Sequence, residues 1–144
     1  MPKSTEVCNY LLALIFNTTT WANIAQNAVA APLTNLYIAL YTDDPGLGGD
    51  PRTNEANYGN YARLAVTRDT NGWKVPTGGQ TKNKSLAQFI ECNGGSNTIT
   101  YAAIVTTPSG DGDVLYSGQL GSPRTISNGI QPQFAAEALV VTET

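Results

Sequence analysis

The sequence contains no histidine among its 144 residues. Histidine is the commonest general base and the commonest metal ligand near neutral pH, so its absence removes the usual catalytic and metal-binding arrangements. The sequence also lacks a nucleophile-elbow serine motif, a phosphate loop and a dinucleotide-binding fingerprint. We therefore expect a protein that is not an enzyme, with no catalytic residue, no bound metal and no cofactor.

Charged residues are scarce as well, at 13% of the chain against about 25% in an average soluble protein. The net charge is −3, and Lys82 and Lys84 are the only basic residues close together, so we expect no nucleic-acid partner. No segment is long enough to cross a membrane, so we expect no membrane partner either. Weak charge repulsion fits a protein that packs against other proteins, but it equally fits a monomer with an uncharged polar coat.

The sequence has only two cysteines, Cys8 and Cys92. They are too few for a disulfide scaffold, and their spacing matches no metal motif. Cys8 lies in an apolar stretch, so we expect a buried free thiol there. The apolar run Leu11–Phe16 is too short for a signal peptide and no cleavage site follows it, which predicts synthesis and folding in a cytoplasm.

The N-terminal segment has the apolar spacing of a helix. Ser4 or Thr5 can cap it, and Asn17–Thr20 should end it. A second short helix is expected over 21–30, before Pro32. The predicted apolar face of the first helix consists of Val7, Tyr10, Leu11, Leu14 and Ile15.

Thr, Gly and Asn are abundant, with 18, 14 and 13 copies. Thr favours strands, whereas Gly and Asn favour turns. Asn71-Gly72 and Asn128-Gly129 favour two-residue hairpins, and Trp73 and Val75 are predicted to share one face of a short strand. The predicted strands are 36–42, 61–68, 73–75, 85–91, 98–106, 114–120, 124–127, 130–134 and 138–142.

Short strands at this regular spacing predict a sandwich or jelly roll. The expected fold is all-β, a jelly-roll-like β-sandwich with a short N-terminal helical segment. We expect a single domain over 1–144, with the helical segment at 1–31 and the sandwich at 32–144. The strand Leu36–Thr42 is apolar on both faces and should be covered on both sides.

The stretch "LYIALYTDDPGLGGD" places three carboxylates close together, on Asp43, Asp44 and Asp50. A calcium loop would need ligands at alternate positions and a final bidentate Glu, and this stretch has neither. Asp-Pro-Gly instead favours a turn whose Asp oxygens accept backbone N–H groups. No acidic residue stands in the apolar context of a glycosidase acid, and "TGGQTK" at 77–82 also favours a turn.

Aromatic residues are the remaining candidates for a binding platform. Several lie at alternating strand positions, where core residues also occur, so a core or subunit-interface role is favoured over a sugar or nucleotide site. These residues are Trp21, Tyr37, Tyr41, Tyr58, Tyr61, Trp73, Tyr101 and Tyr116.

The chain resembles a family of short virion proteins of tailed bacteriophages, often labelled tail-fibre proteins, some of which are capsid cement or decoration proteins. The order and spacing of several blocks carry the resemblance. Tyr41 stands where this family often has His, and Glu137 where it often has Gly. The blocks are "LIFNTTTWANIA", "LYIALYTDDPGLGGD", "TNEANYGNYARLAV", "GW", "CNGGSNTITYAAI", "LYSGQL" and "ISNGIQPQFAAEALVV".

The resemblance implies a jelly-roll protein bound to the outer surface of a phage capsid, which it stabilises as a cement protein. Its partners would be the major capsid protein and a second copy of itself, as a homodimer rather than a trimer. The alternative is a tail or tail-fibre component used in host attachment. The loop after the strand Leu36–Thr42 and the N-terminal helix are the expected contact regions. The candidate partner contacts are Asp43, Asp44, Asp50, Arg52, Tyr58, Tyr10 and Leu14.

Overall fold

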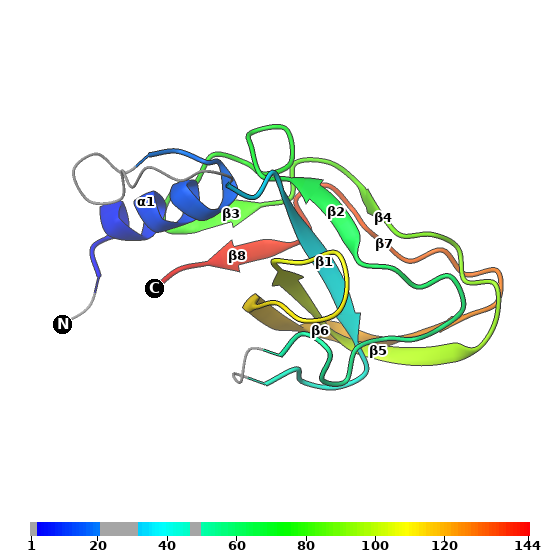
Figure 1. Cartoon of the computed structure of the whole chain (residues 1–144). Coiled ribbons are helices and arrows are strands. Elements are labelled where there is room, and N and C mark those ends of the chain that lie inside the picture. The colour runs from blue at the N-terminus through cyan, green and yellow to red at the C-terminus, as the bar shows by residue number, and fades with distance from the viewer. Residues whose placement is uncertain (1–2, 21–31, 47–49) are drawn as a thin grey trace. The chain divides into compact units, whose positions relative to one another are not determined.

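The computed structural model describes residues 3–20, 32–46 and 50–144. Within these ranges the chain forms one helix and eight strands (Figure 1). The chain divides into two compact units, and each is assembled from separated segments. Unit 1 consists of 1–35, 67–87 and 134–144, and unit 2 consists of 36–66 and 88–133. The predicted helix at 21–30 lies outside the described residues, as does Trp21.

In unit 1, helix α1 spans Thr5–Phe16, close to the predicted bounds. The Ser4 hydroxyl accepts the Val7 N–H at 3.2 Å and caps the first turn. The predicted apolar face was wrong in its position. The fully buried residues of the helix are Cys8, Leu12 and Phe16. None of the five residues of the predicted face is fully buried, and Tyr10 is exposed. Residues four apart stack on one side of a helix, and the three buried residues form such a row.

The C-terminal end of α1 is held by Arg68, whose guanidinium donates to the carbonyls of Leu14 at 2.7 Å and of Ile15. A cation at this end also complements the helix dipole. Burial lowers the pKa of Arg68. Phe16 packs edge-on against buried Trp73, with ring centroids 4.6 Å apart. The helix is therefore fixed to unit 1 by both polar and aromatic contacts.

Beside α1, unit 1 contains a two-stranded antiparallel sheet of β3 (Gln80–Lys82) and β8 (Val140–Thr142) (Figure 1). Strand β3 follows a turn from Thr77 to Gln80, whose two central glycines have φ of 60° and 76°. The turn predicted over 77–82 is confirmed only for 77–80, and the second half of that stretch is β3, which was missed because its residues are polar. The Asn9 amide oxygen accepts the Gly79 N–H at 2.7 Å.

Unit 2 contains the main sheet, which is antiparallel where β5 pairs with its two neighbours and has the order β2-β1-β5-β6. Strand β1 (Asn35–Tyr41) is buried on both faces, as predicted. Its register against β5 (Ser96–Val105) places Ala39 opposite Ala103. One core cluster of this sheet consists of Ala39, Tyr41, Ala103 and Val105, with Tyr37, Tyr101 and Val114 packed against it.

The sheet ends on one side at β6 (Val114–Ser127), the longest strand. The sequence predicted two strands here, but the structure has one strand with two register irregularities, at Leu115 and at 120–123. Arg124 lies opposite Ile99 and Gln119 opposite Tyr101, so residues 120–123 face a single residue of β5. Pro123 is compatible with this place, because bulged residues do not pair and Pro has no N–H to donate.

The remaining strands are shorter than predicted. Strand β2 spans Leu64–Thr67, and a two-residue pair joins β4 (Ala87–Gln88) to β7 (Gln133–Phe134). Trp73 and Val75 do not share a face, because Trp73 is fully buried and Val75 is 66% exposed.

The turn at Asn71-Gly72 is also different from the predicted hairpin. Neither residue has the positive φ that a type I′ turn requires. The turn instead starts at Asp69, whose carboxylate accepts the N–H groups of Asn71 at 2.8 Å and Gly72 at 3.2 Å. These hydrogen bonds lower the pKa of Asp69.

Glu137 has a φ of 64°, in the region that favours Gly. This conformation accounts for the Gly that the phage proteins often carry at the corresponding place. The Glu137 carboxylate lies 2.8 Å from the Lys74 ammonium and 4.0 Å from that of Lys82. The lysines lower the pKa of Glu137, chiefly through the hydrogen bond from Lys74.

The structure confirms the predicted fold class: a mostly β chain with antiparallel sheets and a single short N-terminal helix among its described residues. The single domain over 1–144, divided at residue 32, stays a prediction.

Candidate functional site

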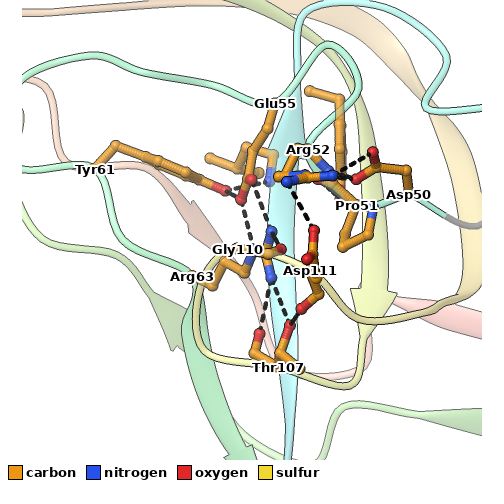
Figure 2. A network of polar contacts seen from close by, with 11 residues as sticks. Asp50, Pro51, Arg52, Glu55, Tyr61, Arg63, Thr107, Gly110 and Asp111 are labelled. Atoms are coloured by element: carbon orange, nitrogen blue, oxygen red, sulfur yellow. Dashed lines mark hydrogen bonds and ion pairs between the residues drawn. The ribbon is translucent and has the colours of Figure 1, made fainter.

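Most of the candidate contacts lie where two loops of unit 2 meet (Figure 2). One loop follows β1 and the other follows β5 and leads into β6. We call residues 42–46, 50–57 and 106–113 the loop cluster. Its architecture depends on three residues of the chain that the sequence did not single out for this purpose, Glu55, Arg63 and Thr107.

Arg63 is at the centre of the loop cluster, and only 1% of its side chain is exposed. Its Nε and Nη2 donate to the two Glu55 carboxylate oxygens at 2.7 and 2.8 Å. Nη1 donates to the carbonyl and hydroxyl of Thr107, at 3.0 and 2.9 Å, and Nη2 also reaches the Gly110 carbonyl at 2.9 Å. These five bonds match the five N–H donors of a guanidinium, so the buried charge is satisfied (Figure 2).

Tyr61 connects the same ion pair to the sheet. Its hydroxyl donates to Glu55 at 2.9 Å and accepts the Leu40 N–H of β1 at 3.1 Å. Burial raises the pKa of Tyr61, and the neighbouring Glu55 raises it further. The phenol is therefore a fixed neutral donor. Its ring packs edge-on against Tyr58, with centroids 5.2 Å apart.

Tyr41 of β1 also holds the first loop, from the core side. This side chain is fully buried, and its hydroxyl donates to the Pro51 carbonyl at 3.0 Å. Burial raises the pKa of Tyr41 to about 12. Asn54 closes the loop, because its amide donates to the Asp44 carbonyl at 2.9 Å and its own carbonyl accepts the Thr42 N–H at 2.9 Å.

Asp43 and Asp44 form the predicted turn. The Asp43 carboxylate accepts the Asp44 N–H, and that of Asp44 accepts the Gly46 N–H, both at 2.8 Å. These are local side-chain-to-backbone bonds of the kind that Asp forms in turns. The turn interpretation of this stretch is confirmed, and both carboxylates lie at the surface.

Asp50 and Arg52 form the exposed part of the loop cluster. The Arg52 guanidinium donates to both Asp50 oxygens at 3.0 Å, and its Nη1 lies 2.7 Å from the Asp111 carboxylate of the second loop. Hydrogen bonds from Arg52 lower the pKa of Asp50. With 58% of its side chain exposed, Arg52 links the two loops at the surface.

The other predicted contacts are elsewhere. Tyr58 belongs to unit 2 but is 3% exposed, which leaves almost none of its surface for a partner. Tyr10, which is 49% exposed, and half-buried Leu14 belong to α1 in unit 1. The structure therefore brings together Asp43, Asp44, Asp50 and Arg52, and their role in binding a partner stays a prediction.

A comparison with models of protein families decides the class of protein. The model of the podophage GP4 fiber I protein gp80 family matches residues 4–142. The chain belongs to this family. A comparison with curated proteins finds no match. Membership in the podophage fibre family confirms a bacteriophage structural protein, but the family description does not extend to capsid cement or decoration.

The described aromatic residues of this gp80-family chain lie mainly in its interior. Trp73, Tyr41 and Tyr58 are buried, while Tyr37, Tyr61, Tyr101 and Tyr116 are half-buried. This placement supports a packing role over an open binding platform. No helix in the described ranges is long and apolar enough to span a membrane.

Within 3–20, 32–46 and 50–144, no three Cys, Asp or Glu side chains are grouped as metal ligands. We predict that a chelator leaves the melting temperature of the wild-type gp80-family protein unchanged, because the Asp43 and Asp44 carboxylates are engaged with backbone N–H groups of their own turn. The double variant Asp43→Asn/Asp44→Asn is the control and should be equally insensitive. A chelator-dependent fall in the melting temperature of the wild type that is absent in the variant would contradict this prediction.

Proposed function

We propose that this protein is a passive structural component of a phage fibre and binds a neighbouring virion protein through the loop cluster. The match to the podophage fiber I family over residues 4–142 is the observation that carries the proposal. Catalysis is not part of this role, and the contacts of the buried charges support that view. Glu55 and Arg63 are neutralised by each other and by the surrounding hydrogen bonds.

The construction of the loop cluster fits a binding surface. Its two loops are tied together from inside by Arg63 and at the surface by Arg52. A surface that is already ordered loses less entropy on binding than a flexible one. Loops positioned by a rigid sheet are also a common place for contacts. At the rim, the carboxylates of Asp43 and Asp44 favour a partner with basic or amide side chains.

A second role, capsid decoration, is favoured by the size of the helix. In the described part of the chain the sole helix has 12 residues, whereas a coiled-coil stalk needs several heptads. As a decoration protein it would lie on the outer surface of the capsid and bind the major capsid protein. A ligand that binds only the assembled shell stabilises that shell by mass action.

Immunogold labelling of whole particles tests the two roles against each other. An antibody against this chain should label the tail region if the fibre proposal is correct. Label confined to the head contradicts the fibre role and supports decoration. Particles without the protein provide a second measurement: a decoration protein should raise the temperature at which packaged DNA is released, whereas a fibre protein should change adsorption to the host.

A further inference from the structure

The outer edge of β6 is the end of the main sheet as far as the described residues go. In the sheet order β2-β1-β5-β6, no described strand pairs with the side of β6 that faces away from β5. Residues 117–119 and 121–125 are exposed, and a Cβ added at Gly118 or Gly121 would meet nothing within 4 Å. Alternate backbone groups of a strand point to opposite sides, so this edge presents N–H and C=O groups that another strand can pair with.

Charged side chains give most of this edge no protection against such pairing. Native proteins commonly place charges on open edges, Lys above all. Here the segment Val114–Pro123 contains no charged residue. Register irregularities at Leu115 and at 120–123 interrupt this strand, which leaves Tyr116–Gln119 as its regularly paired segment.

Charges stand at both ends of this segment, and they have opposite signs. Asp113 precedes it, beside Thr106, to whose N–H its carbonyl is bonded at 3.1 Å. Arg124 lies just beyond the other end of the segment, because its partner on β5 is Ile99, two residues from Tyr101, the partner of Gln119. Both charged residues are exposed, and neither forms an ion pair with another described residue.

We propose that two copies of this chain pair in antiparallel fashion through the open edge of β6, about a twofold axis near Ser117. Ser117 lies opposite Ala103, which is two residues of β5 from Val105, opposite Val114, and two from Tyr101, opposite Gln119. If an antiparallel second copy is centred at Ser117, its Arg124 lies near Asp113 of the first copy. Its Asp113 then lies near Arg124 of the first copy. The edge is thus complementary to itself, as a twofold interface must be.

This interface goes beyond the proposed function, because it applies to a fibre protein and to a decoration protein alike. It also explains why the edge can do without protective charges: its partner is a second copy. The pairing joins two four-stranded sheets into one continuous sheet of the dimer, with two ion pairs that favour the antiparallel direction.

Charge reversal tests the interface in purified full-length protein by sedimentation equilibrium. We expect the wild type at twice the chain mass and the single variants Asp113→Arg and Arg124→Asp near the chain mass, since like charges then face each other. An equimolar mixture of the two single variants should return to twice the chain mass. In the mixed pair, one copy carries two positive ends and the other two negative ends.

Two further variants control the experiment. Glu91→Arg reverses an exposed charge elsewhere in unit 2 and should stay dimeric. Ser117→Lys places two like charges at the axis of a pair of variant copies and should be monomeric on its own. Circular dichroism melts confirm that each variant is folded. A monomeric wild type, reversal variants that stay dimeric, or a mixture that fails to reassociate would each overturn the proposal.

Discussion

Replacing Arg63 by Ala should lower the free energy of unfolding by about 3–5 kcal/mol, the usual cost of leaving a buried charge without its partner. The half-buried Glu55 carboxylate would lose its ion-pair partner beside the Tyr61 hydroxyl, and the carbonyls of Thr107 and Gly110 would lose their donor. Arg63→Lys should not rescue the protein, because one ammonium cannot reproduce a bidentate guanidinium contact. Urea denaturation followed by circular dichroism measures the change.

Arg52→Ala is the matched control for Arg63→Ala. It removes another Arg that forms ion pairs in the same loop cluster, but an exposed one, and exposed pairs contribute little. Its denaturation midpoint should therefore stay close to that of the wild type. Hydrogen exchange should rise in 50–57 and 106–113 for the Arg63 variant. An equal loss of stability for the two variants would contradict the view that the buried pair holds these loops.

Replacing Trp73 by Ala should cost a similar amount, about 3–5 kcal/mol, because it leaves a large cavity in unit 1. Trp73 is fully buried and supports Phe16, the last residue of α1. We expect the loss to appear first as faster hydrogen exchange in α1. Val75→Ala is the control, since this side chain is 66% exposed and its truncation should leave stability unchanged.

If Trp73→Ala melts like the wild type, the aromatic pair is not what secures the helix. In that case Arg68, which binds the carbonyls of Leu14 and Ile15, would be the remaining anchor. Exchange rates in α1 compared between Trp73→Ala and Arg68→Ala separate these two contributions.

The features that the sequence predicted correctly are those decided by near neighbours. Asp44 and Gly46 are two residues apart, so an Asp-Pro-Gly turn can be inferred from the residues themselves. A cap at Ser4 or Thr5, of which the structure uses Ser4, and the strand around Leu36–Tyr41 also follow from local pattern. The all-β class needed only composition and the spacing of strands and turns.

The features that it missed depend on distant partners. Thr107 is 44 residues from Arg63, and the residues near Arg63 in the sequence do not indicate that its guanidinium binds a second loop. The one local signal was the apolar context of "NYARLAV", which marks an Arg that must be paired if it is buried.

Two errors had other causes. Helix α1 is apolar around most of its circumference, so the row through Leu12 and the row through Leu11 were both compatible with the pattern. In β6, the residues Gly121, Ser122 and Pro123 have the composition of a turn, but they form a bulge within one strand. Composition alone does not distinguish a bulge from the end of a strand, because both omit ladder hydrogen bonds.

The interleaving of the two units has a consequence for how the chain is made. The segments of unit 2 end at residue 133, whereas unit 1 needs 134–144, including β8, whose partner β3 lies some sixty residues earlier. Units emerging from the ribosome generally fold in the order in which they are completed. Unit 2 is therefore ready to fold first, although residues 3–20 leave the ribosome before any of it. The contacts of helix α1 with Arg68 and Trp73 can form once residue 87 has been made, whereas strand β3 stays without its partner β8 until the last residues of the chain are added.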